Sequence, residues 1–251
     1  MSNVFSSLCD DFYVDMYVNT ELELPARRDT VLAFFERIQK QFPAMGYFYR
    51  GDNGAYCLEE ARNAGQYRWI TLEMDRLGSG VVNPAALEDA YTQDRLILDL
   101  MPYMLSVSHL DIDSLDVVFA MDFDCADGHD EVIAETLLAT RLGCLRDLLG
   151  AKTIDFSPSL VVALSDDCRT QARICLESKT SIYDPDKQRQ ILDEPITLSL
   201  TIRQYPSNIE KFDTLKSFEN QCRLAEELMA EKIVPNLVQP LISVIAQRRL
   251  S

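Results

Sequence analysis

The chain has 251 residues, of which 47% are hydrophobic and 25% are charged, as in ordinary globular proteins. Its 24 lysine and arginine residues against 40 aspartate and glutamate residues give a formal net charge of −16. That charge is repelled by phosphate backbones and by anionic lipid, so we expect no nucleic-acid partner and no membrane partner.

The cysteines and the N-terminal residues bear on the compartment. The seven cysteines form no Cys-x-x-Cys pair and lie mostly inside apolar segments, which is typical of buried, reduced thiols. Residues 1–10 have no basic region and no long apolar run, so they do not predict a signal peptide. The longest apolar stretches are too short to cross a bilayer. The sequence therefore predicts a cytoplasmic protein.

The first half of the chain predicts a strand, a helix, a hairpin, a strand and a second helix. Alternating apolar residues indicate the strands, Pro25 suits the first turn of a helix that Pro43 ends, and Gly51–Gly54 suits a hairpin turn. We expect the strand that begins at residue 67 to end at Gly78-Ser79-Gly80. In chain order the elements cover residues 12–24, 25–43, 47–58, 67–74 and 84–102.

The second half repeats this order. A nearly continuous apolar run predicts a buried strand, and apolar residues at helical spacing predict the helices. We expect the last helix to bend at Pro235 and Pro240. In chain order the elements cover residues 115–121, 130–149, 160–176 (a hairpin), 196–203 and 208–249.

The repeated order predicts an α+β fold. We expect two similar β-α-β-β-α modules of the ferredoxin-like kind, packed as a pseudo-dimer, with a long C-terminal helix. The first module would cover residues 1–110 and the second residues 111–251, with one continuous domain as the alternative. A cleft between the two modules would be the default pocket for a small ligand.

Conventional catalytic motifs are missing. The chain has no Gly-x-x-x-x-Gly-Lys-Ser/Thr loop, no Gly-x-Gly-x-x-Gly and no Gly-x-Ser-x-Gly, and it has only two histidines. We therefore assign no catalytic residue and no cofactor. The expected function is that of a non-catalytic interaction or assembly protein, and a small-ligand binding module is one alternative.

Four acidic residues offer another alternative. Asp122 and Asp124 end a predicted strand with both carboxylates on one face, and Asp166 and Asp167 form the apex of the predicted hairpin. If the hairpin lies beside that strand, as in a ferredoxin-like module, the four carboxylates converge. Carboxylates so placed bind Mg²⁺ or Mn²⁺, and two such ions promote phosphoryl displacement.

A resemblance points the same way. The segments Phe119-Ala120-Met121-Asp122-Phe123-Asp124 and Leu164-Ser165-Asp166-Asp167 resemble the palm-like core shared by nucleotide cyclases, diguanylate-cyclase domains and many polymerases. The resemblance implies a divalent-metal-dependent nucleotide enzyme, and the acidity of the chain fits a cyclase better than a polymerase, which needs a basic channel. The simpler interpretation is that Asp166 and Asp167 form an ordinary turn.

The predicted C-terminal helix offers a surface for a partner. Apolar residues recur on it at three- and four-residue spacing, which is typical of a seam for another helix. The helix either packs on its own fold or docks on a second copy or another protein. The candidate interface residues are Leu215, Phe218, Cys222, Met229, Leu237 and Leu241.

Overall fold

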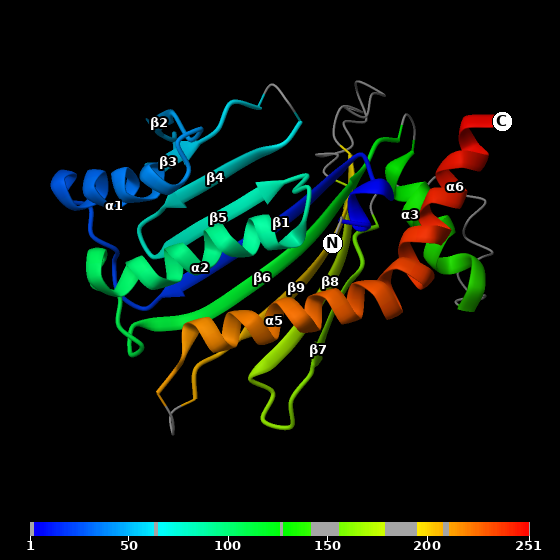
Figure 1. Cartoon of the computed structure of the whole chain (residues 1–251). Coiled ribbons are helices and arrows are strands. Elements are labelled where there is room, and N and C mark those ends of the chain that lie inside the picture. Colours follow the sequence, from blue (N-terminus) through cyan, green and yellow to red (C-terminus); the bar gives the residue numbers. More distant parts are fainter. Residues whose placement is uncertain are drawn as a thin grey trace, which may run out of the picture.

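A single antiparallel sheet of nine strands runs through the described part of the chain (Figure 1). Its strand order is β2-β3-β4-β5-β1-β6-β9-β8-β7, so β2 and β7 are the two edges. The computed structural model describes residues 3–62, 65–125, 128–141, 156–178, 195–207 and 211–250.

The two halves of the chain contribute different numbers of strands. The first half comprises β1 (Asp11–Thr20), α1 (Arg28–Gln41), β2 (Tyr47–Arg50), β3 (Tyr56–Glu59), β4 (Tyr67–Leu72), β5 (Arg76–Val82) and α2 (Leu87–Met104), after a 3-10 turn at Phe5–Ser7. The second half comprises β6 (Ile112–Phe123), α3 (His129–Arg141), β7 (Ser159–Ala163), β8 (Thr170–Ser178), β9 (Ile196–Gln204), α5 (Thr214–Leu228), the π-helical η3 (Met229–Val238) and α6 (Gln239–Leu250).

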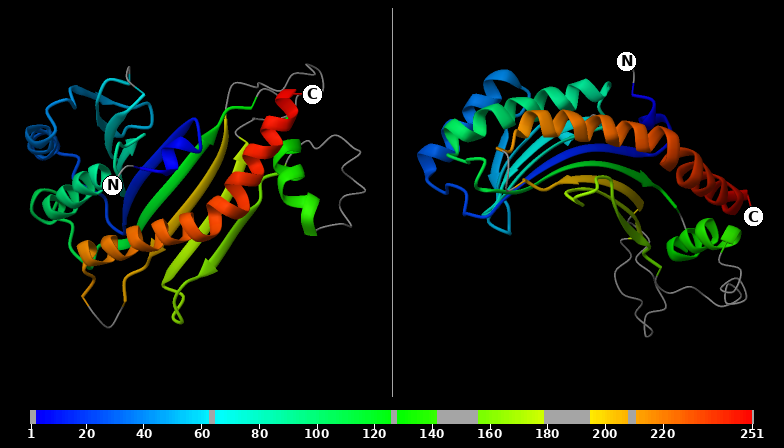
Figure 2. Two further views of the ribbon diagram at one scale, coloured as in Figure 1. Left: turned by 45° about the vertical axis from the view of Figure 1, so that its right-hand side comes forward. Right: turned by 90° about the horizontal axis from the view of Figure 1, so that it is seen from below.

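One face of the sheet is covered by α1, α2 and α5, and we call the opposite face the open face (Figure 2). Strand β1 shows why the two faces differ. Phe12, Val14, Met16 and Val18 point to the helices and are at most 1% exposed, whereas the alternate residues face the other way. The hydrophobic core therefore lies between the sheet and the helices, and the open face carries the polar side chains.

The central strands β1 and β6 join the two halves. They pair antiparallel over their whole length, with Val14 opposite Phe119. Phe119 packs against Phe12 with ring centroids 5.6 Å apart and against Phe5 at 6.1 Å. The sheet and its core are thus continuous across the predicted boundary between residues 110 and 111.

The α+β class is confirmed, but the ferredoxin-like modules and their pseudo-dimer are not. In the described residues, four strands lie between α1 and α2 and three between α3 and α5, whereas a β-α-β-β-α module has two. The prediction that the strand beginning at residue 67 ends at Gly78-Ser79-Gly80 is wrong. These residues form the middle of a separate strand, β5, and the aromatic rings of Tyr17 and Trp69 lie against its glycines.

The last helix continues without a break through its prolines, and it bends between α5 and α6 (Figure 1). Pro235 lies inside η3, where the wide turns of a π-helix accommodate a residue that lacks an N–H donor. The predicted start of this helix at residue 208 lies outside the described residues. The first described turn begins at Thr214, after Asp213, whose carboxylate accepts a hydrogen bond from the Lys216 amide. The predicted helix 130–149 is observed as α3, and residues 142–149 lie outside the described part.

Length and composition alone would allow this helix to cross a membrane. The segment Thr214–Arg249 contains an 18-residue window with a mean hydropathy of 1.3, of which 28% is buried. A helix packed on a sheet passes the same test, and Met229, Val238 and Leu241 are buried in the core. The cytoplasmic location stays a prediction.

Candidate functional site

The predicted metal ligands Asp122 and Asp124 lie at the C-terminal end of β6. The Asp122 carboxylate accepts hydrogen bonds from the Tyr13 hydroxyl at 2.9 Å and from the Thr197 hydroxyl at 2.6 Å. Burial of Tyr13 and the negative charge of Asp122 raise the pKa of that hydroxyl. The backbone amide of Asp124 donates to the Asp10 carboxylate at 2.7 Å. Asp122 is therefore satisfied by neutral hydroxyl donors.

The other two predicted ligands, Asp166 and Asp167, lie at the opposite end of the sheet. Their hairpin lies between β7 and Thr170 of β8. Thr170 pairs with Gln204 of β9, and Gln204 in turn pairs with Leu115 near the start of β6. Leu115 and Asp122 are seven residues apart in β6, a span of roughly 23 Å at 3.3 Å per residue. Strand β9 also lies between β6 and the hairpin.

The structure therefore does not bring the four carboxylates together. Asp167 accepts hydrogen bonds from the Ser165 hydroxyl at 2.6 Å and the Arg169 amide at 3.1 Å, and these bonds lower its pKa. This is the geometry of an ordinary turn. In the described residues, no group of three or more His, Cys, Asp or Glu side chains is placed to hold a metal ion.

The six candidate interface residues of the C-terminal helix pack within the chain itself. Phe218, Cys222, Met229 and Leu241 are between 0% and 4% exposed, and Leu215 and Leu237 pack partly buried against the same core. Helix α5 lies on β6 and β9, and Phe218 meets the Tyr91 ring of α2 edge to face at 5.9 Å. The apolar seam thus serves internal packing between helix and sheet.

The open face carries an electrostatic feature that sequence reasoning missed. Asp15, Tyr17, Trp69 and Arg76, which we call the Asp15 cluster, lie together on β1, β4 and β5. The rings of Tyr17 and Trp69 are 6.0 Å apart, and the Arg76 guanidinium lies 3.7 Å from the centre of the Tyr17 ring. The alternation of Tyr13, Asp15 and Tyr17 with buried residues was the signal that could have located this cluster.

Asp15 has no direct partner for one carboxylate oxygen. Its Oδ1 is buried and makes no hydrogen bond, although the residue as a whole is partly exposed. Burial raises the pKa of the carboxyl to about 8, and the charge of Arg76 opposes that rise. Asp116, on the neighbouring strand β6, differs because Arg203 binds its two oxygens at 2.6 and 2.7 Å.

The raised pKa predicts a pH dependence of stability. In the unfolded chain an aspartate has a pKa of about 3.9, so folding adds a proton to Asp15 between that value and about 8. The free energy of unfolding should fall as the pH rises through this window, by at most ~1.4 kcal/mol per pH unit from this group, and level off above it. Asp15→Asn should remove that part of the slope.

Urea denaturation of wild type and Asp15→Asn from about pH 5 to pH 9 measures this difference. Asp94, a fully buried residue whose pKa is also raised by burial, contributes a slope of the same sign to both proteins. Because the charge of Asp15 also raises the pKa of Asp94, the difference between the two curves reports Asp15 together with this effect on Asp94. Parallel curves across the whole range would show that the Asp15 carboxyl is ionised in the folded state at neutral pH.

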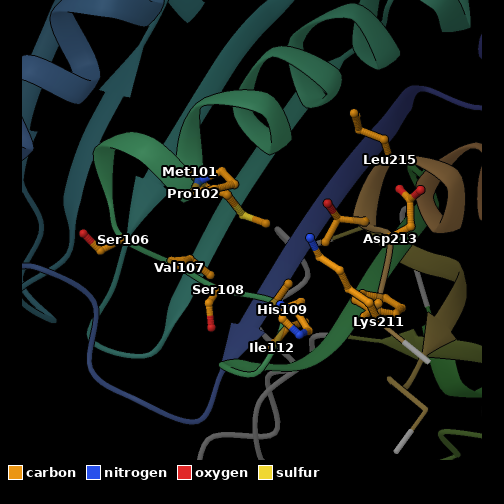
Figure 3. A pocket seen from close by; sticks show the side chains of 12 residues that line it. Met101, Pro102, Ser106, Val107, Ser108, His109, Ile112, Lys211, Asp213 and Leu215 are labelled. Carbon is orange, nitrogen blue, oxygen red and sulfur yellow. The ribbon is translucent and has the colours of Figure 1, made fainter. Parts of the chain in front are cut away.

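A cavity of about 610 Å³ lies between the two halves of the chain (Figure 3). The end of α2 and the connection to β6 form one wall, and the start of α5 forms the other. Apolar side chains such as Met101, Val107 and Leu215 share the lining with His109 and Lys211. The size is that of small-ligand sites, and ligand binding in a cleft between the halves stays a prediction.

The edge strand β7 is an exposed aliphatic segment of the described chain. All five of its residues are exposed, and Leu160, Val161 and Val162 are 57%, 55% and 38% exposed. The opposite edge, β2, is also exposed, but Phe48 packs on Phe35 with ring centroids 5.5 Å apart. Exposed apolar patches and unpaired strand edges mark sites of association.

Comparison with known proteins assigns no relative. No family model matches the chain, and no curated protein matches it. Any functional conclusion therefore depends on the geometry of the cavity, the open face and the strand edges.

Proposed function

We propose that this chain is a non-catalytic interaction or assembly protein whose binding element is the edge strand β7. The observation that carries the proposal is the exposure of every residue of β7 on both sides of the strand. An extended segment added to such an edge gains backbone hydrogen bonds together with apolar side-chain contacts. The chain's own packing occupies the residues of the C-terminal helix that the sequence suggested as a partner surface, which favours β7.

Natural proteins protect exposed edges with charged residues, prolines or bulges, and β7 contains none of these. Residues 159–163 contain no lysine, no proline and no charged side chain, and the pairing of β7 with β8 has no register shift. An edge of this composition associates with other strands unless it is covered. The presence of such an uncharged edge in a chain of net charge −16 supports a role in binding.

We also propose that the two halves are related modules arranged as a pseudo-dimer. Each half places a strand, a helix, a run of antiparallel strands and a second helix in the same order. Both second helices carry a fully buried glutamine that donates to two strand carbonyls. Gln93 reaches Trp69 and Gly80 at 3.2 and 3.3 Å, and Gln221 reaches Leu115 and Ile202 at 2.7 Å each.

The edge-binding function is tested with labelled, uncharged, extended peptides rich in valine and threonine, measured by fluorescence anisotropy. We expect binding to wild type and loss of binding to Val161→Pro, because proline removes a backbone donor from the edge. Arg50→Pro, a matched change on the opposite edge β2, should leave this binding intact. Equal binding to all three proteins, or to none, would contradict the proposal.

A second function is favoured by the cavity between the halves. Its lining is partly apolar and also holds Lys211 and Asp213. It fits a small molecule with an apolar body and one anionic group, which Lys211 would attract. Ligand-observed NMR with a panel of aromatic and aliphatic carboxylates tests this candidate. Binding should weaken in Lys211→Glu and in Met101→Trp, which fills the cavity, and equal signals in the variants would count against a site here.

A further inference from the structure

The backbone of β7 presents a regular set of outward hydrogen-bonding groups. The Leu164 amide donates to Thr170, and the Leu176 amide donates to Pro158. Bonded pairs alternate along an antiparallel ladder, so Leu160 and Val162 direct their N–H and C=O groups toward β8. The N–H and C=O groups of Ser159, Val161 and Ala163 therefore point away from the sheet.

We propose that the occupant of this edge is β7 of a second copy of the chain, paired antiparallel about a two-fold axis at Val161. This inference rests on the proposed function and specifies the partner. With Val161 opposite its own equivalent, Ser159 faces Ala163 of the other copy, and the outward groups form about six backbone hydrogen bonds. The two nine-stranded sheets then become one continuous sheet.

The side chains of β7 suit this self-pairing. On the helix side of the sheet Leu160 lies opposite Val162 of the second copy, and on the open side two valines meet at the axis. Such aliphatic cross-strand pairs stabilise a sheet. The remaining pair is Ser159 with Ala163 of the second copy, and both side chains are small. The register centred on Val161 therefore brings no bulky side chains into collision.

Charge does not oppose the pairing of two copies through this strand. With a net charge of −16, two copies repel each other over most possible contacts. Residues 157–165 are uncharged, so pairing through β7 opposes no like charges. The nearest cation on the open side, Arg173, lies on β8 opposite Val161. Two such cations would be about 14 Å apart across the dimer, beyond the screening length of roughly 8 Å at physiological salt.

Analytical ultracentrifugation over a range of protein concentrations tests the proposal. Wild type should show a reversible monomer–dimer equilibrium, weak because a five-residue edge makes an interface smaller than ~1,200 Å². Val161→Pro removes only an outward N–H group, so it should raise the dissociation constant at least about tenfold while the monomer stays folded. Val161→Lys, which places two ammonium groups at the axis, should do the same.

Cysteine variants test the register. Val161→Cys should form an interchain disulfide under mild oxidation, because paired Cα atoms lie about 5.5 Å apart. Ala163→Cys should not, because the two copies of that residue are roughly 14 Å apart. Wild type, whose thiols include the exposed Cys168, gives the background level of interchain disulfide formation.

Arg50→Pro on β2 should leave the dimer unchanged. Wild type that remains monomeric at its highest soluble concentration, or Val161→Pro that remains dimeric, would overturn the self-pairing. A monomer that still binds the extended peptides would overturn only this inference and leave the edge-binding function standing. A monomer that binds no peptide would remove both.

Discussion

Phe119→Ala is expected to lower the free energy of unfolding by about 3–5 kcal/mol. The loss should affect both halves of the sheet equally. Phe119 is fully buried on β6, and its ring packs against Phe12 and Phe5 of the first half. Truncation removes these contacts and leaves a cavity where the two halves meet. Tyr103→Ala, at a side chain that is 89% exposed, should change stability by less than about 0.5 kcal/mol.

The chain offers a direct way to see whether the halves unfold together. Its single tryptophan, Trp69, lies on β4 in the first half, whereas Phe119 lies in the second. Tryptophan fluorescence therefore follows the first half, and far-UV circular dichroism follows both. In Phe119→Ala the two denaturation curves should shift by the same amount and remain superimposed. A fluorescence transition that stays in place while the dichroism transition shifts would indicate two independent domains, divided near residue 110.

Local patterns in the sequence predicted many of the individual elements. The alternation in residues 12–24 and 196–203 identified β1 and β9, because each has one face in the core. The alignment of the strands could not be read in this way, because pairing depends on contacts between distant segments. The placement of β9 between β6 and the hairpin is such a contact, and it separates the carboxylates that the sequence suggested as a metal site.

The candidate sites show the same limit. The apolar seam of the C-terminal helix predicts a packing surface, but a periodic pattern does not identify what it packs against. For Asp15, the alternation in residues 12–24 predicts only a polar residue on the strand face that points away from the core. Its buried Oδ1 and the indole of Trp69, which approaches from β4, both lie against the Gly80 backbone. The exposure of β7 likewise depends on its position at the edge of the sheet, which no residue in that strand encodes by itself.

Gly80→Ala is expected to lower the free energy of unfolding by about 2–3 kcal/mol, because a methyl group at this position has no room. An added Cβ would overlap the Asp15 carboxylate and lie 2.5 Å from Trp69 Nε1. The change should also displace the Trp69 ring and shift its fluorescence emission. Gly46→Ala is the matched control, because its Cβ would have only the Ala44 carbonyl oxygen nearby, at 4.0 Å.

Comparing these two variants distinguishes two explanations for the presence of Gly78-Ser79-Gly80 inside a strand. Glycine weakens a strand interior unless another group approaches the backbone closely. If the glycines make room for the Asp15 cluster, Gly80→Ala destabilises the protein and Gly46→Ala does not. If the segment were a mobile strand end, as its composition suggests, alanine would be tolerated equally at both positions or would stabilise the chain by restricting its unfolded state. Such a result would also remove the close contact that buries the Asp15 carboxylate, and with it the basis for the predicted dependence on pH.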